Sequence, residues 1–239
     1  MKYLRQYIRQ VLLTEGMNTH DMLPENIGIK VTESQGRYKT IHIVYYDLGT
    51  RIEHKRKHQA SKEGIYGSIL ISPLYPYEPD YDYKEIWGGY LEHWPEREEM
   101  ENLTCNGAYQ VLSAQAAEGW GPLLYDVAIE IATLKGTGLL SDRTSVSQEA
   151  RNVWNIYMYD RSDVKKFQCD DQYNTLTSTS EDNVDMEIPG AEDYLYDEEY
   201  ILSNPLSKRY SKEPTVLTAM KNNHKLIQDK YTPHKKTLH

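Results

Sequence analysis

The chain has 239 residues, of which 39% are hydrophobic and 26% charged, and its formal net charge is −9. This is enough for one large domain with a buried core. No apolar run approaches the roughly 20 residues of a membrane-spanning helix, and the first residues lack the apolar segment of a secretory signal. Cys105 and Cys169 are too few for a disulfide framework. We therefore expect a protein of a reducing compartment, neither secreted nor in a membrane, and the negative charge argues against a general nucleic-acid binder.

Charge and aromatic residues are unevenly distributed along the chain. Residues 170–199 contain many carboxylates and no Lys or Arg, whereas the segment from Lys208 to the C-terminus is basic. Pairing between these segments of two chains predicts a homo-oligomer that weakens with salt. The chain also has 21 Tyr and one Phe, which favours protein contacts because a tyrosine ring is apolar and its hydroxyl tolerates water. A tyrosine-rich core is the alternative.

The first part of the chain predicts one helix and three strands. Residues 1–15 place their apolar side chains on one stripe, which predicts an amphipathic helix. Runs of β-branched and aromatic residues predict strands at 41–46 and 66–72, and a third strand is predicted at 87–94.

The middle of the chain predicts a strand, a glycine turn, a helix, a short strand and a second helix. The first strand covers 108–115, and the first helix begins at Pro122, where a missing N–H costs nothing. Its apolar residues recur at helical spacing. A buried strand follows at 139–141, and Ser145 with Gln148 forms a capping-box pattern for the next helix.

Beyond Asp160 the periodic patterns fade. We expect 161–239 to be an irregular extension, first acidic and then basic, that lies on the core or on a partner and contains one helix around 215–229. The predicted organisation is thus an amphipathic helix at 1–15, an α/β domain at 16–160 and this extension.

The glycine turn Gly119-Trp120-Gly121 is the first candidate site. A glycine-rich turn before a helix binds anions, because backbone N–H groups converge there and the helix N-terminus adds about half a positive charge. The spacing matches neither the dinucleotide fingerprint nor a Walker loop. Close packing of strand and helix at a turn is the alternative interpretation.

The stretch from Gln115 through Gly119 and Gly121 into the following helix resembles the acetyl-CoA signature of GCN5-related N-acetyltransferases. Ser147-x-x-Ala150-x-x-x-Trp154 resembles the family's next helix. The resemblance implies an α/β (α+β) fold with a central mixed, mostly antiparallel sheet flanked by helices.

The resemblance also implies which residues bind acetyl-CoA. Backbone groups of the strand would pair with the pantetheine arm, and backbone amides of the turn would face the pyrophosphate. These residues are Leu112, Ser113 and Ala114 for the arm, Gln115 at the start of the signature, and Gly119, Trp120 and Gly121 for the pyrophosphate.

Three departures from the family pattern bear on catalysis. Gln115 lies one residue early, and Pro122 removes an N–H where the family aims one at a phosphate. Trp154 stands where the family commonly has the tyrosine that protonates the leaving thiolate, which an indole cannot do. Tyr157 is the candidate acid in its place, with Tyr159 as the second choice.

A general base is also required to deprotonate an amine nucleophile. Glu85, Glu92 and His93 are candidates on the predicted neighbouring strand, and nothing in the sequence selects among them. The eight histidines form no pattern of metal ligands.

Leu13-Thr14-Glu15 resembles the site cut by prohead proteases of large tailed bacteriophages, and the helix before it then resembles a capsid-targeting peptide. A helix that docks on its own domain is the alternative. Two functions remain open: acetyl transfer from acetyl-CoA to a primary amine, and an inactive scaffold among virion proteins. We expect the protein in a phage virion or in the host cytoplasm.

Overall fold

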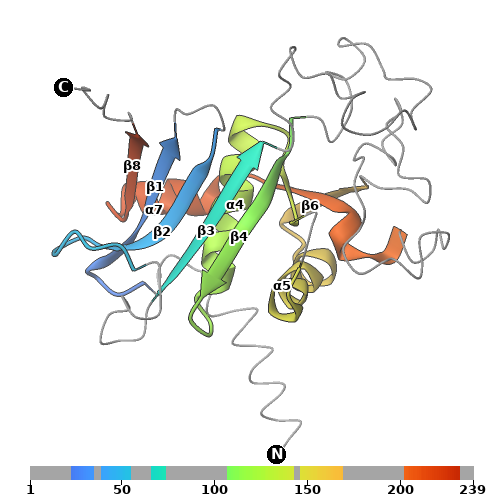
Figure 1. Ribbon diagram of the computed structural model, residues 1–239, viewed down its shortest axis with the longest axis horizontal. Coiled ribbons are helices and arrows are strands. Elements are labelled where there is room, and N and C mark those ends of the chain that lie inside the picture. The colour runs from blue at the N-terminus through green and yellow to red at the C-terminus, as the bar shows by residue number, and fades with distance from the viewer. Residues whose placement is uncertain are drawn as a thin grey trace, which may run out of the picture.

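The computed structural model describes residues 23–34, 39–54, 66–73, 107–142, 146–168 and 202–231. These residues form one eight-stranded mixed sheet with helices packed against it (Figure 1). No described helix is long and apolar enough to cross a membrane. The predicted helix at 1–15, the predicted strand at 87–94 with its candidate bases, and both cysteines lie outside the described residues.

The described elements follow one another in a fixed order along the chain. They are β1 (Ile27–Ser34), β2 (Ile41–Asp47), β3 (Gly67–Pro73), β4 (Tyr109–Ala116), α4 (Gly121–Lys135), β5 (Leu139–Leu140), α5 (Gln148–Tyr159), β6 (Val164–Gln168), a 3₁₀ turn (Pro205–Ser207), β7 (Lys208–Lys212), α7 (Thr215–Asn222) and β8 (Leu226–Tyr231).

The order of the strands in the sheet is β6-β7-β5-β4-β3-β2-β1-β8. Five neighbouring pairs are antiparallel, and two, β4 with β5 and β1 with β8, are parallel. The expectation of a mixed, mostly antiparallel sheet flanked by helices is therefore confirmed. β4 and β5 are joined by α4, the helical crossover that a parallel pair requires.

The core lies between the sheet and α4. In β1 the apolar residues alternate, and the antiparallel register with β2 places Ile29 opposite Tyr45 and Val31 opposite Ile43, all buried. Side chains opposite each other in a ladder share one face, which α4 and α7 cover (Figure 1). α5 packs beside α4, where the rings of Tyr125 and Trp154 meet edge to face.

Most elements predicted before residue 160 are confirmed where the structure describes them, but one cap was misplaced. Ser147, not Ser145, is the N-cap of α5, and its side chain accepts a hydrogen bond from Ala150 N–H. The helix begins at Gln148, and only the residue directly before it can reach that amide.

The prediction of an irregular extension after residue 160 was wrong for the described part of that segment. β6, β7 and β8 belong to the sheet, and β7 lies between β5 and β6. The predicted helix at 215–229 ends at Asn222, because His224 takes a positive φ of 55° and the chain continues as β8. β7 has the polar sequence KRYSK and is nevertheless buried, which composition did not indicate.

Candidate functional site

β4 lies in the middle of the sheet, yet it has a neighbour on its β5 side for only two residues. Tyr109 pairs with Leu139 and Gln110 with Leu140, and no other described strand continues along that side. Residues 112–115 are all exposed, Leu112 by 41%. Successive side chains of a strand point to opposite faces, so four exposed residues in a row mean that no described element fully covers either face here. We call residues 112–115 the open edge of β4.

A β-bulge lies at the start of the open edge. Leu70 of β3 pairs with Ser113 and Ile71 pairs with Val111, so Leu112 is the extra residue on β4. A bulge interrupts the hydrogen-bond ladder and turns a strand locally, and bulges are enriched beside active sites. It falls on Leu112, the first residue that the family resemblance assigns to the pantetheine arm.

The predicted anion site follows directly after the open edge. Gly119 has a positive φ of 87°, a conformation that favours glycine, and Trp120 is the N-cap of α4. No side chain caps this end of the helix, and its first turn contains no acidic residue. The first turn of α4 therefore holds no acidic side chain to offset the positive end of the helix dipole, and the nearest carboxylate before it in the chain is that of Glu118.

An anion can come close to the backbone of the first turn of α4. A Cβ added to Gly121 would have the Ala116 side chain, at 3.8 Å, as its one neighbour within 4 Å. Pro122 has no N–H, and the first amides of a helix lack intrahelical acceptors. The amides of Gly121 and Leu123 are therefore the first-turn donors that this helix offers to a ligand.

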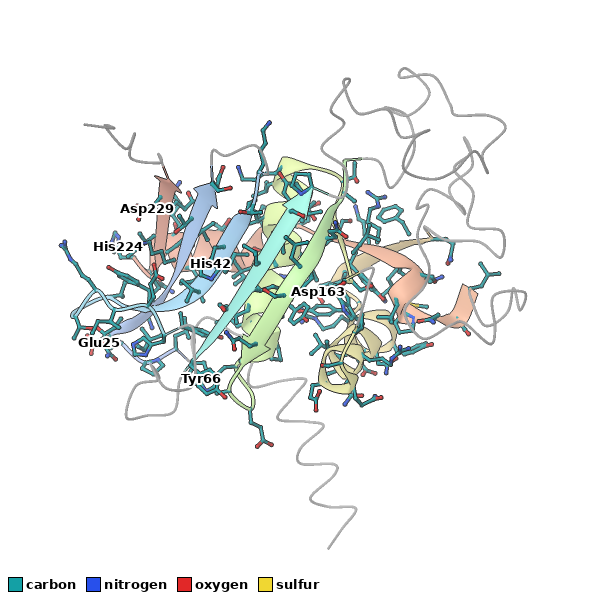
Figure 2. The ribbon with its side chains drawn as sticks, viewed as in Figure 1. Glu25, His42, Tyr66, Asp163, His224 and Asp229 are labelled. Carbon is teal, nitrogen blue, oxygen red and sulfur yellow. The ribbon has the colours of Figure 1, made fainter. Side chains whose placement is uncertain are left out.

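Two strands hold the turn in place. Ala117 N–H donates to the carbonyl of Tyr66, 2.9 Å away and directly before β3 (Figure 2), and Trp120 N–H donates to Ala117 O. From β2, the hydroxyl of Tyr45 donates to the carbonyl of Trp120 at 2.6 Å. The turn is thus positioned by contacts with the sheet as well as by its own sequence.

The two candidate acids on α5 donate to protein acceptors. Tyr157 is buried, and its hydroxyl donates to Asp126 Oδ1 at 2.8 Å and lies 3.3 Å from the carbonyl of Pro122. Burial, and then the charge of Asp126, raises the pKa of Tyr157 well above its ordinary value. Tyr159 is exposed and donates to the carbonyl of Ser203. Tyr157 therefore reaches the first turn of α4, but its proton is directed to Asp126.

Trp154, at the position of the family's tyrosine, belongs to the core. Its ring stacks on Tyr210 of β7 with centroids 5.0 Å apart, and its edge meets Tyr125 of α4. The side chain is buried. Trp154 thus joins α5 to both the sheet and α4.

Sequence reasoning missed two buried carboxylates on α4. Asp126 is 1% exposed and forms an ion pair with Arg161, 3.1 Å away, which also pairs with Asp163 just beyond α5 (Figure 2). Burial raises the pKa of Asp126, and the charge of Arg161 opposes this effect. The signal was available, since a carboxylate within an apolar helical stripe requires a buried partner.

Glu130, one turn further along α4, is the second buried carboxylate. It pairs with Lys212 of β7 and accepts hydrogen bonds from the backbone amides of Val216 at 2.9 Å and Leu217 at 2.7 Å. These amides belong to the first turn of α7, whose own N-cap, Pro214, supplies no side-chain bond. Glu130 thus takes the place of a capping residue and fixes α7 to α4.

The described residues contain no group of three side chains suited to a metal ion. Comparison of the chain with models of known protein families, with curated proteins and with solved structures gives no match. Inference about function therefore rests on the chemistry of the open edge and the turn. The open edge spans about 10 Å at 3.3 Å per residue, with the amide donors of α4 beyond it.

Proposed function

We propose that the protein binds acetyl-CoA and is an N-acetyltransferase-like protein that transfers the acetyl group to a primary amine. The pantetheine arm lies along the open edge of β4, and the pyrophosphate lies at the N-terminus of α4. One observation carries this proposal: the exposed strand edge leads directly into an uncapped helix N-terminus.

The chemistry of acetyl-CoA matches both parts of this surface. The pantetheine arm is an extended chain with two amide groups, and such a chain can pair with a free strand edge as an added strand does. The pyrophosphate that follows is an anion suited to a helix N-terminus. The order strand, glycine turn, helix, strand, helix supports the resemblance to GCN5-related N-acetyltransferases.

Transfer would depend mainly on positioning. The neutral amine attacks the thioester carbonyl and gives up a proton to a general base, the C–S bond breaks, and the thiolate leaves with a proton from an acid. A backbone amide near the bulge at Leu112 would polarise the carbonyl. Tyr157 is the candidate acid, although its proton is held by Asp126.

A second candidate is a catalytically inactive scaffold among virion proteins. It is favoured by the same geometry at α5, where Tyr157 and Tyr159 both donate to protein acceptors and Trp154 is buried. Such a protein would bind acetyl-CoA without turnover, or not at all. Binding partners, self-association, and a location in the virion or the host cytoplasm belong to this proposal.

Calorimetric titration with acetyl-CoA tests the site. We expect micromolar affinity, about −8 kcal/mol, for the unaltered protein. Gly121→Val places a side chain where the diphosphate would lie, in a position with room for a Cβ, and should abolish measurable binding. Gly49→Val, in an exposed turn after β2, is the matched control and should bind normally. No heat with the unaltered protein, or normal binding by Gly121→Val, would refute the site.

Turnover separates the two candidates. Acetylation of a panel of primary amines, followed by release of free CoA thiol, should be detected if the protein is an enzyme. Tyr157→Phe should then lower kcat by about 10²-fold or more with little change in the affinity for acetyl-CoA. Binding without turnover, together with the protein's presence in purified virions by mass spectrometry, would establish the scaffold instead.

A further inference from the structure

Among the described residues, Tyr45 is the one whose side chain donates a hydrogen bond to the carbonyl of Trp120, the N-cap of α4. It lies on β2, separated from β4 by β3, and its side chain is 0% exposed. Its hydroxyl donates to Trp120 O at 2.6 Å, and its ring meets the Trp120 ring edge to face, with centroids 5.3 Å apart. β2, which lies two strands away from β4 in the sheet, thus contacts the start of α4 through one hydrogen bond and one ring contact.

Fixing this carbonyl also orients the amide that faces the ligand. The carbonyl of Trp120 and the N–H of Gly121 belong to the same peptide group, which is planar and trans. In a trans peptide the C=O and N–H bonds point in opposite directions. With the oxygen held on Tyr45, toward the core, the Gly121 N–H is directed away from it.

Gly119 is the most flexible residue of the turn, and it lies between two hydrogen bonds that hold the turn to the sheet. The carbonyl of Tyr66 holds Ala117 N–H, and Tyr45 holds Trp120 O, with Gly119 between them. Glycine permits many backbone conformations, so the turn depends on its anchors for a single geometry. A preorganised anion site binds more tightly because its amides need not be ordered on binding.

We infer that Tyr45 is a positioning residue for the diphosphate site: it holds the Trp120–Gly121 peptide so that the Gly121 amide points at the ligand. The identity of the ligand rests on the proposed function, whereas the constraint on the turn does not. Tyr45 contacts no reacting atom, and its effect on a ligand passes through the backbone of Trp120.

Tyr45→Phe removes the hydroxyl and keeps the ring. Tyr210→Phe is the matched control, because Tyr210 is equally buried and its hydroxyl donates to the carbonyl of Pro205 at 2.7 Å, away from the turn. Both variants lose one buried hydroxyl–carbonyl bond and should lose similar stability. Acetyl-CoA should bind Tyr45→Phe about tenfold more weakly and Tyr210→Phe within about twofold of the unaltered protein.

Amide hydrogen exchange in the ligand-free protein provides an independent measurement. The amide of Ala117 donates to Tyr66 O and the amide of Trp120 donates to Ala117 O, and in Tyr45→Phe both should exchange about tenfold faster, with no change in Tyr210→Phe. If the unaltered protein does not bind acetyl-CoA, the proposed function fails while this exchange still decides the role of Tyr45. Equal exchange in all three proteins, or equally weakened binding in both variants, would overturn the inference.

Discussion

The two ends of β4 have the same strand conformation but different surroundings. At the first end, Tyr109 and Gln110 pair with β5 and lie near the aromatic contacts of α5 and β7. At the other end, residues 112–115 are exposed, and no described strand pairs with them on the β5 side. β5 is only two residues long, so β4 is paired on this side at its first end, which we call the closed end, and is unpaired by described strands at the other, which we call the open end.

The proposed function assigns different roles to the two ends of β4. An unpaired strand edge in the middle of a sheet leaves strong donors and acceptors exposed, and proteins usually cover such edges. Here the edge leads into the N-terminus of α4, which suits a ligand with an amide chain and an anionic group. Changes at the closed end should therefore affect folding, and changes at the open end should affect binding.

Trp154→Ala should give the largest effect, at the closed end. The side chain is buried between Tyr210 and Tyr125, and truncating it leaves a cavity where three elements meet. We expect a loss of about 4 kcal/mol in the free energy of unfolding, measured by urea denaturation. Trp154→Phe retains a ring and should lose less than half of this. A loss below about 1 kcal/mol for the alanine variant would contradict this packing.

Glu130→Gln should have the next largest effect. It keeps the shape of the side chain but removes the closest counter-charge of the buried Lys212 ammonium, which then has only Asp163, 3.9 Å away, as an ion-pair partner among the described residues. We expect a loss of about 3 kcal/mol in unfolding free energy. Lys212→Met in the same chain should recover part of this loss, because the buried charge that has lost its closest partner is then removed. Additive losses in the double variant would show that the two side chains are not coupled.

The raised pKa of Asp126 should make the free energy of unfolding depend on pH. Its pKa is raised in the folded protein by burial, so between its ordinary value of 3.8 and the raised value the folded state binds more protons than the unfolded state. Stability from this group therefore falls as pH rises through that window. Relative to Asp126→Asn, the unaltered protein should gain stability as pH is lowered from 7 toward 4, measured by urea denaturation at each pH. A difference that is independent of pH would show that the pKa of Asp126 is not raised.

Leu112→Ala should have the smallest effect. The side chain is exposed at the open edge, so the loss in unfolding free energy should be within about 1 kcal/mol. The proposed contacts with acetyl-CoA use the backbone, so the affinity should change by less than about threefold. A large loss of stability would mean that this edge is covered in solution and would remove the contrast between the two ends of β4.

Local patterns predicted the elements around the candidate site. Runs of β-branched and aromatic residues predicted β2 and β3, strand composition predicted β4, and the helical stripe after Pro122 predicted α4 with its start almost correctly placed. β1 was missed, although Ile27, Ile29 and Val31 alternate with smaller or polar residues in the pattern of a half-buried strand. The signal for this strand is therefore present in the sequence.

β7 and β8 were missed for a different reason. The polar side chains of β7 are buried because particular partners satisfy them: Lys212 pairs with Glu130, and Lys208 donates to the carbonyl of Leu202. β8 is a short strand whose position follows from pairing with β1 at the other end of the chain. Burial of charged residues and pairing between distant strands depend on contacts that periodicity does not contain.

The sequence by itself determined the strand, the glycine turn and the helix, because turn residues and apolar periodicity act between residues a few positions apart. The tertiary structure decided the rest of the site. The open edge of β4 exists because β5 stops pairing after Leu140, and the turn is anchored by Tyr45, 75 residues away from Trp120. Backbone hydrogen bonds across a sheet join residues regardless of their separation along the chain, so only the folded molecule shows which of them are left free for a ligand.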